Sequence, residues 1–163
     1  MNTITLIKSI RYLIANDAIM MGYLGKSTVA DALTRLGIKH GFYMQKDGQY
    51  TLPAIAIIVN DDEDREFLPV SELFVKFAIV NKFENPDAMM RCIQMKDRLK
   101  DLLCNKKNTD IKHESINSQA STLGLTLKVR DSRWVSGITY DDQEQGSQRL
   151  HKIDCVIKMV VGD

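Results

Sequence analysis

The chain has 163 residues, which is enough for one domain with its own buried core, so no disulfide or metal is needed to hold it together. Its 22 Lys and Arg nearly balance its 21 Asp and Glu, and the formal net charge of +1 excludes a strong overall field that would attract DNA or an anionic membrane. The longest apolar stretch, 54–59, is too short to cross a bilayer, and the first residues give no basic leader followed by a long apolar run, so we expect neither a membrane span nor an export signal.

Two helices are predicted at the start of the chain. Apolar residues recur at intervals of three and four from about Thr3 to Asn16, which predicts an amphipathic helix. The residues of this stripe are Leu6, Ile7, Ile10, Leu13 and Ile14. A shorter helix is predicted from Val29 to Leu36, because Thr28 with Asp31 three positions later is a capping arrangement and Gly37 would close the helix.

The tripeptide Gly25-Lys26-Ser27 matches the end of a phosphate-binding loop. The full motif needs a second glycine five positions before the first, where this chain has Met20. Such a loop also follows a buried strand, whereas the residues before this one are predicted to be helical. We therefore favour a capped helix over a nucleotide site.

Two strands are predicted in the middle of the chain. Pro53 precedes an apolar run from Ala54 to Val59 whose isoleucines and valine suit a central strand. From Leu68 to Asn81 the apolar residues follow a period of two, which predicts a second strand. The residues between them, Asn60 to Glu66, carry five acidic side chains and predict a solvated loop.

A long helix is predicted after Asn85-Pro86-Asp87, because proline is tolerated in the first turn and Asp complements the positive end of a helix. Its apolar stripe comprises Cys92, Met95, Leu99 and Leu102, with Met89 and Leu103 beside it. The polar stretch from Asn108 to Ala120 is interpreted as an excursion or a weak strand.

Three strands are predicted in the remaining residues. They cover 123–129, 133–139 and the region from His151 to Val161, with a polar turn from Tyr140 to Gln148. Consecutive strands are joined by tight turns rather than by crossover helices. The fold class is therefore predicted as α+β, a single domain with a mainly antiparallel β-sheet and two or three α-helices packed on one face.

Residues that could carry catalysis or bind a metal are sparse. No histidine among His40, His113 and His151 stands at a metal-ligand spacing from another histidine or a cysteine. The cysteines, at positions 92, 104 and 155, form no CxxC pair and suggest reduced thiols in a cytoplasmic protein. Four consecutive acids could gather a magnesium ion, but adjacent carboxylates on a loop are poorly preorganised, and a solubilising loop is favoured. They are Asp61, Asp62, Glu63 and Asp64.

Trp134 stands next to Arg133 and near Arg130, which is compatible with stacking and charge contacts to a nucleic acid. Packing of the indole against a neighbouring strand or subunit explains the same residues equally well. The sequence therefore predicts no enzyme, no cofactor and no metal site, and it leaves a nucleic-acid-binding module as an alternative.

Three stretches carry a resemblance to a known family. They are FYMQKDGQYTLPAIAIIV (42–59), VKFAIVNKFENPDAMMRCIQMKDRLKDLL (75–103) and GITYDDQEQGSQRLHKIDCVIKMVV (137–161). These stretches follow an opening amphipathic helix. In the order of these elements, the chain resembles the tail terminator or tail-completion proteins of long-tailed bacteriophages. Residues 22–37 and 108–120 look like insertions into a single domain spanning 1–163, so another neck component, such as a stopper or adaptor, remains an alternative.

The resemblance implies a structural role in the virion. It implies a homohexameric ring that stops polymerisation of the tail tube and offers a surface to the head–tail connector proteins, with genome DNA passing through the lumen without sequence-specific binding. The expected partners are sister copies, the tail tube protein and the connector, with no membrane. The expected location is the tail or neck of the virion, and the host cytoplasm during assembly.

Candidate residues for contacts between subunits or with partners come from the exposed side of the second strand and from the acidic loop. A strand that is apolar on both faces has more surface to cover than one flanking layer of helices can hide, and a neighbouring copy could bury the surplus. The strand positions are Phe74, Lys76 and Val80, and the loop positions are Asp61, Asp62, Glu63 and Asp64.

Overall fold

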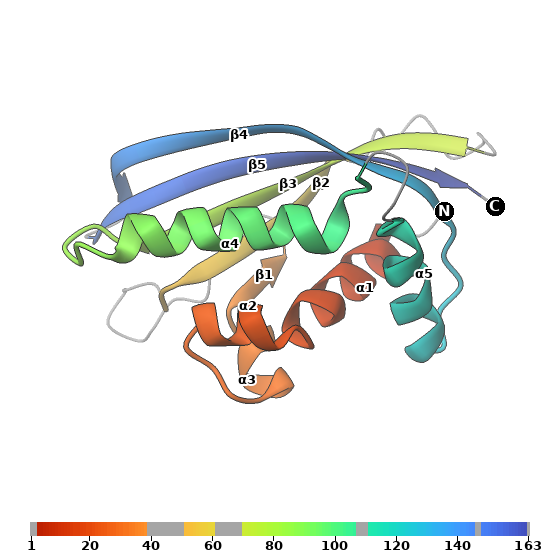
Figure 1. The fold of residues 1–163 in the computed structure, drawn as a ribbon, viewed down its shortest axis with the longest axis horizontal. Helices are drawn as coiled ribbons and strands as arrows, with labels where there is room; N and C mark the ends of the chain where they lie inside the picture. Colours follow the sequence, from red (N-terminus) through yellow and green to blue (C-terminus); the bar gives the residue numbers. More distant parts are fainter. Residues whose placement is uncertain (1–2, 39–50, 61–69, 107–110, 146–147, 163) are drawn as a thin grey trace.

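The computed structural model of the chain describes residues 3–38, 51–60, 70–106, 111–145 and 148–162 (Figure 1). These residues contain five helices and five strands. In chain order they are α1 (Thr3–Ala15), α2 (Ala18–Tyr23), α3 (Val29–Leu33), β1 (Leu36–Ile38), β2 (Ala54–Asn60), β3 (Val70–Lys82), α4 (Ala88–Leu103), α5 (His113–Thr122), β4 (Val129–Gln145) and β5 (Gln148–Gly162). None of these helices is long and apolar enough to cross a membrane.

The strands form one sheet in the order β1-β2-β3-β5-β4. β1 runs parallel to β2, and the other neighbouring pairs are antiparallel. All the helices lie on one side of this sheet, with α4 directly beneath it (Figure 1). The predicted α+β class, with a mainly antiparallel sheet and helices on one face, is therefore confirmed.

The core fills the space between the helices and the inner face of the sheet. The period of two in β3 places Val75 and Phe77 on that face, and both are fully buried. α4 contributes the predicted stripe of Cys92, Met95 and Leu99, all fully buried. α1 buries the predicted Leu6, Ile10 and Ile14 against the same cluster.

The region from Gly22 to Gly37 differs in part from the prediction. The hydroxyl of Thr28 accepts a hydrogen bond from the backbone N–H of Asp31 at 3.2 Å, so the predicted cap is confirmed. The helix nevertheless ends at Leu33, and Gly37 belongs to β1 rather than to a helix end. The reason is that residues 36–38 pair in parallel with Ile55 to Ile57 of β2, and this pairing requires an extended backbone.

The residues that resembled a phosphate-binding loop form the end of helix α2. Gly25 has φ +67° and its N–H bonds to the carbonyl of Gly22 at 3.1 Å, while the N–H of Lys26 bonds to the carbonyl of Met21 at 2.9 Å. These two bonds make a glycine-dependent helix C-cap. The segment follows a helix, as expected, and not a strand.

The polar stretch 108–120 was predicted as an excursion or weak strand. Residues 108–110 lie outside the described part of the chain, and the prediction is wrong from His113 onward. Residues His113–Thr122 form helix α5, which buries Ile116 and Ala120 at the helical spacing of four. The strand predicted over 123–129 is wrong up to residue 128, because β4 begins only at Val129.

The closing hairpin is longer than predicted. β4 continues through the expected link at 130–132, and it also continues through most of the expected polar turn to Gln145. β5 resumes at Gln148 and places the predicted face of alternating apolar residues in the core. Long strands with polar side chains are stable here because β4 and β5 pair along nearly their whole length.

Candidate functional site

Each helix that the structure describes lies on the inner side of the sheet, so none of these five covers the outer face (Figure 1). Its side chains alternate with those of the core, so β3 presents Phe74 and Lys76 outward between buried Leu73, Val75 and Phe77. Phe74 is 44% exposed, which is unusual for a phenylalanine in the middle of a strand. This face, which carries the exposed Phe74, defines the first part of the candidate site.

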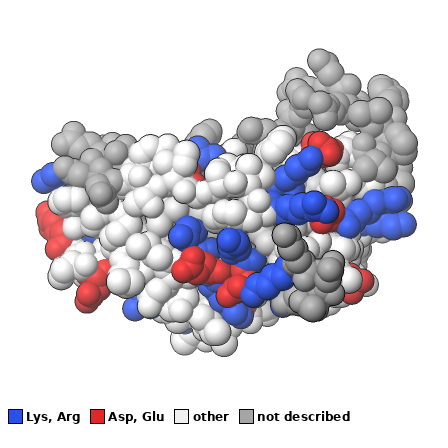
Figure 2. All heavy atoms as spheres, turned by 45° about the horizontal axis from the view of Figure 1, so that its top comes forward, with Lys and Arg blue, Asp and Glu red and all other residues white. Residues whose placement is uncertain are grey.

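The charged groups of the outer face are paired across neighbouring strands. The ammonium groups of Lys76 and Lys152 lie 3.1 and 3.5 Å from one carboxylate oxygen of Asp154, and Lys158 lies 2.8 Å from Glu72. Figure 2, turned so that this face comes forward, shows Lys and Arg interleaved with Asp and Glu. Such pairing leaves a mixed surface rather than the continuous basic stripe that a nucleic acid would need.

The predicted interface positions have different outcomes. Phe74 and Lys76 lie on the outer face as expected. Val80 was predicted to be exposed, and this is wrong: it is fully buried in a small cluster with Ala54 and Leu150, against which Leu52 packs. The cluster forms because the register places Ala54 directly opposite Val80. The acidic positions Asp61, Asp62, Glu63 and Asp64 lie outside the described residues.

β4 is the edge strand of the sheet. Over the first residues of β4, other elements of the same chain form hydrogen bonds with its outer edge. The side-chain amide of Asn117 on α5 donates to the carbonyl of Val129 at 2.9 Å and accepts from the N–H of Val129 at 2.7 Å. Further along, the backbone N–H of Asn105 donates to the carbonyl of Ser132 at 2.9 Å. Two asparagines thus occupy the edge positions that a neighbouring strand would otherwise fill.

From residue 133 to 140 the described parts of the chain leave the edge of β4 open. Within the part of the chain that the structure describes, no hydrogen bond from another element reaches the outer edge of these residues. Val135 and Ile138, in the same segment, are 50% and 52% exposed. The open edge and its two exposed apolar side chains form the second part of the candidate site.

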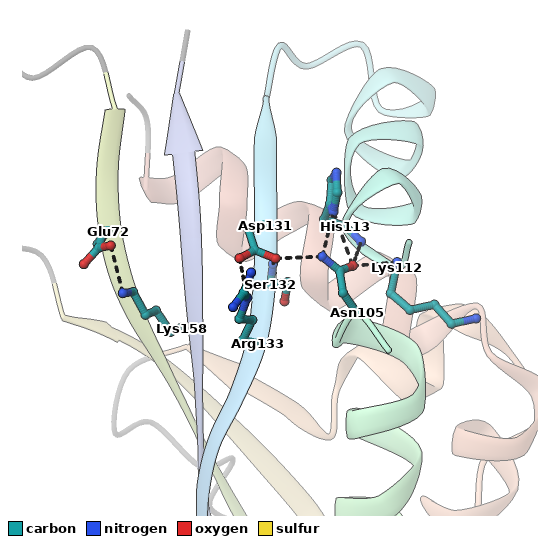
Figure 3. Close-up of polar contacts among 8 residues, drawn as sticks. All are labelled: Glu72, Asn105, Lys112, His113, Asp131, Ser132, Arg133 and Lys158. Atoms are coloured by element: carbon teal, nitrogen blue, oxygen red, sulfur yellow. Dashed lines mark hydrogen bonds and ion pairs between the residues drawn. The ribbon is translucent and has the colours of Figure 1, made fainter. Parts of the chain in front are cut away.

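Asn105 links three elements at the closed end of β4 (Figure 3). Its amide nitrogen donates to a carboxylate oxygen of Asp131 at 2.8 Å and lies 3.0 Å from the ring nitrogen Nδ1 of His113. Its amide oxygen accepts from the backbone N–H groups of Lys112 and His113 at 2.8 and 3.2 Å. Because every polar atom of this side chain is engaged with backbone or fixed side chains, the cluster holds α4, α5 and β4 together.

Trp134 and its neighbouring arginine lie on different sides of the sheet. The indole turns toward α4, where the ammonium of Lys100 lies 5.3 Å from the ring centroid, and it covers Gly137 so closely that an added Cβ would lie 2.9 Å from the ring. Arg133 instead pairs with Asp131 at 2.6 Å. The packing explanation of Trp134 is therefore supported over a stacking platform for bases.

A hollow of about 330 Å³ lies beside Trp134. It is lined by Asp97, Lys100, Asp101, Cys104, Asn105, Lys106 and Trp134. The hydrogen bond from Lys106 to Asp101, 2.9 Å long, lowers the pKa of that carboxyl. The ammonium of Lys106 and the carboxylate of Asp101, both lining the hollow, are therefore already paired with each other.

Groups suited to covalent or metal chemistry are not assembled among the described residues. Burial raises the pKa of Cys92, Cys104 and Cys155 to about 12, so these thiols are protonated and unreactive at neutral pH. In the same residues, no three His, Cys, Asp or Glu side chains are grouped so that they could hold a metal ion.

Sequence reasoning missed Asn105 and Asn117. A signal for Asn117 was present, because Ile116, Ala120 and Leu123 follow helical spacing and would have placed it on a helix. Nothing local marks Asn105, since its partners are contributed by a later helix and a later strand.

Replacing Asn117 by alanine is expected to lower the free energy of unfolding by about 1–3 kcal/mol, because it leaves the N–H and the carbonyl of Val129 without partners at a half-buried site. Urea unfolding followed by circular dichroism measures this change. The control is Ser118→Ala, which alters an exposed residue of the same helix and is expected to change little. Equal effects of the two variants would contradict the role of Asn117 at the edge.

No model of a known protein family matches this chain, and a comparison with curated proteins finds no significant match, so the site stands on its geometry alone.

Proposed function

We propose that the chain is a structural assembly protein of a long-tailed bacteriophage, which forms a ring at the head-proximal end of the tail tube. The ring would end polymerisation of the tube and provide the surface that joins the head connector. The observation that carries the proposal is the outer sheet face, which presents an exposed Phe74 and is covered by none of the five described helices. The resemblance in the order of the elements supplies the identity of the assembly.

Two further features support a protein that works by contact rather than by chemistry. Its buried thiols are protonated, and the polar cluster around Asn105 is occupied by backbone groups. The charges of the outer face are already paired within the chain, which suits a ring through which DNA slides without being held. The proposed partners are sister copies, the tail tube protein and the head–tail connector proteins.

Phe74→Asp is expected to weaken ring formation while leaving the fold intact, because a carboxylate replaces an aromatic side chain on an exposed face and not in the core. Native mass spectrometry over a range of concentrations should show six copies for the unchanged chain and smaller species for the variant. Met90→Asp, which alters a residue 59% exposed on α4, is the control and should retain the ring.

Electron microscopy of phage particles that lack the protein tests the role itself. Overlong tails are the expected result for a lost terminator. Tubes of normal length that fail to join heads would instead indicate a stopper or adaptor in the neck. Normal particles, or a chain that remains a monomer at every concentration, would contradict the proposal.

A further inference from the structure

We propose that the open edge of β4, from residue 133 to 140, binds an extended segment of another protein that carries an aspartate or a glutamate. The segment would pair with β4 through its backbone and place the acidic side chain in the hollow beside Trp134, next to the ammonium of Lys100. This site goes beyond the proposed ring, which uses the outer face of the sheet, and binding to it requires no ring.

The open edge and the hollow meet at Trp134. Asn105 closes the edge at Ser132, where its backbone N–H donates to the carbonyl at 2.9 Å, and the same residue lines the hollow. Trp134, two residues further along β4, also lines the hollow and lies in the open segment. An exposed edge offers backbone N–H and carbonyl groups to another strand. A strand that pairs with residues 133–140 would therefore lie directly beside the hollow.

The alternation of side chains in a strand directs one position of the added segment into the hollow. Trp134 turns its indole toward α4, on the inner side of the sheet. A neighbouring strand lies about 4.7–4.9 Å away, and the side chains of directly opposed residues point to the same face. The residue opposite Trp134 would thus point toward the part of the hollow that α4 lines.

The charges of the hollow identify the chemistry of the segment. The two carboxylates that line it are those of Asp97 and Asp101. Asp101 is paired with Lys106 at 2.9 Å, and Asp97 lies 3.4 Å from Lys96. Among the described residues Lys100 has no carboxylate partner, and its ammonium instead lies 5.3 Å from the centroid of the indole ring. Each carboxylate therefore has its own lysine, and one ammonium is left over.

An acidic side chain is the occupant that this arrangement favours. A carboxylate can accept a charge-assisted hydrogen bond from Lys100, while its methylene groups pack against Trp134 and Cys104. A lysine or arginine in the same place would meet the charge of Lys100, and like charges repel. An apolar side chain would displace water from the ammonium without replacing its hydrogen bonds, which costs free energy.

A library of random nine-residue peptides without tryptophan, displayed on mRNA and selected on the whole chain, tests the chemistry. Selected peptides should share an acidic residue at one position. Trp134 is the only tryptophan of the chain, so a change in its fluorescence on adding a selected peptide reports directly on the hollow. The proposal fails if no peptide is retained, if the retained peptides share no acidic position, or if they leave this fluorescence unchanged.

Variants of Lys100 test the role of its charge. Lys100→Gln should weaken the binding of a selected peptide about tenfold, the loss expected for one charge-assisted hydrogen bond. Lys8→Gln, at an exposed lysine of α1, is the matched control and should bind like the unchanged chain. Lys100→Glu should reverse the preference, so that a peptide with lysine in place of its acidic residue binds better. Equal binding by Lys100→Gln and Lys8→Gln, or no reversal, would overturn the proposal.

Methylation of the peptide's own amides tests the strand pairing. In an added strand, alternate N–H groups face β4 and the others face away from it. N-methyl groups on one alternate set should therefore abolish binding, and those on the other set should weaken it far less. Equal effects of the two sets would rule out pairing at the edge. Protection of residues 133–140 from amide exchange that grows with the concentration of the free chain would mean that a second copy occupies the edge, and the proposal would fail.

Discussion

Phe77→Ala is expected to destabilise the chain by about 3–5 kcal/mol, which is enough to unfold a domain of ordinary stability or bring it close to unfolding. Phe77 is fully buried at the centre of β3, between the sheet and the helices. Removing its ring loses apolar burial and leaves a cavity that the rigid neighbours on β2 and β5 cannot fill. Thermal and urea unfolding measure the loss.

Phe74→Ala is the matched control for this variant. It removes the same ring from the same strand, three residues earlier, but from the outer face where Phe74 is 44% exposed. The expected loss in the monomer is about 1 kcal/mol or less. Similar losses in the two variants would mean that the outer face is covered, and they would count against both the face assignment and the ring.

Acid is expected to weaken the link between α2 and α4. Asp17 caps α2 by accepting from the N–H of Met20 at 2.8 Å, and it also accepts two hydrogen bonds from Arg98 of α4, at 2.5 and 2.9 Å. Burial alone raises the pKa of Asp17, but the bonds from Arg98 and Met20 outweigh burial, so the pKa lies below its ordinary value of 3.8. A lowered folded-state pKa means that the carboxylate stabilises the fold above about pH 4, and that this stability is lost as the pH falls through the folded value.

Asp17→Asn isolates this contribution, because asparagine can still cap the helix but cannot pair with Arg98 as an anion. We expect a loss on the order of 2 kcal/mol at pH 7, and the difference from the unchanged chain should shrink below about pH 4. Urea unfolding at a series of pH values measures both.

Asp101→Asn removes a second ion pair that involves α4, the pair between Asp101 and Lys106. Its two side chains are 49% and 57% exposed, so the loss should be below about 1 kcal/mol. If the loss for Asp17→Asn did not depend on pH, the stabilisation would come from something other than its charge.

The sequence was sufficient where one face of an element is buried and its neighbours are close in the chain. The stripes of α1 and α4, the alternation in β3 and β5, and the cap at Thr28 all express local spacing, and each is found in the structure. The α+β class follows from the order of these elements, so it could be predicted from the sequence as well.

The sequence was insufficient where the position of a residue depends on a partner far away in the chain. Val80 alternates outward on β3, yet Ala54 and Leu150 from two other strands bury it. The polar residues of β4 suggest a turn, but pairing with β5 keeps them extended. The end of β4 that other elements close is likewise visible only after the positions of Asn105 and Asn117 are known, and nothing local marks Asn105.

The cap that Asn105 places on α5 has a consequence for the order in which the chain folds. Lys112, the N-cap residue just before this helix, makes no side-chain capping bond to it. The helix is also rich in serine, threonine and asparagine, which are weak helix formers. Its first N–H groups depend on Asn105, and Asn117 within it depends on Val129. As the polypeptide leaves the ribosome, α5 should therefore stay unstructured until the hairpin behind it has been made, and a chain truncated before residue 129 should lack this helix.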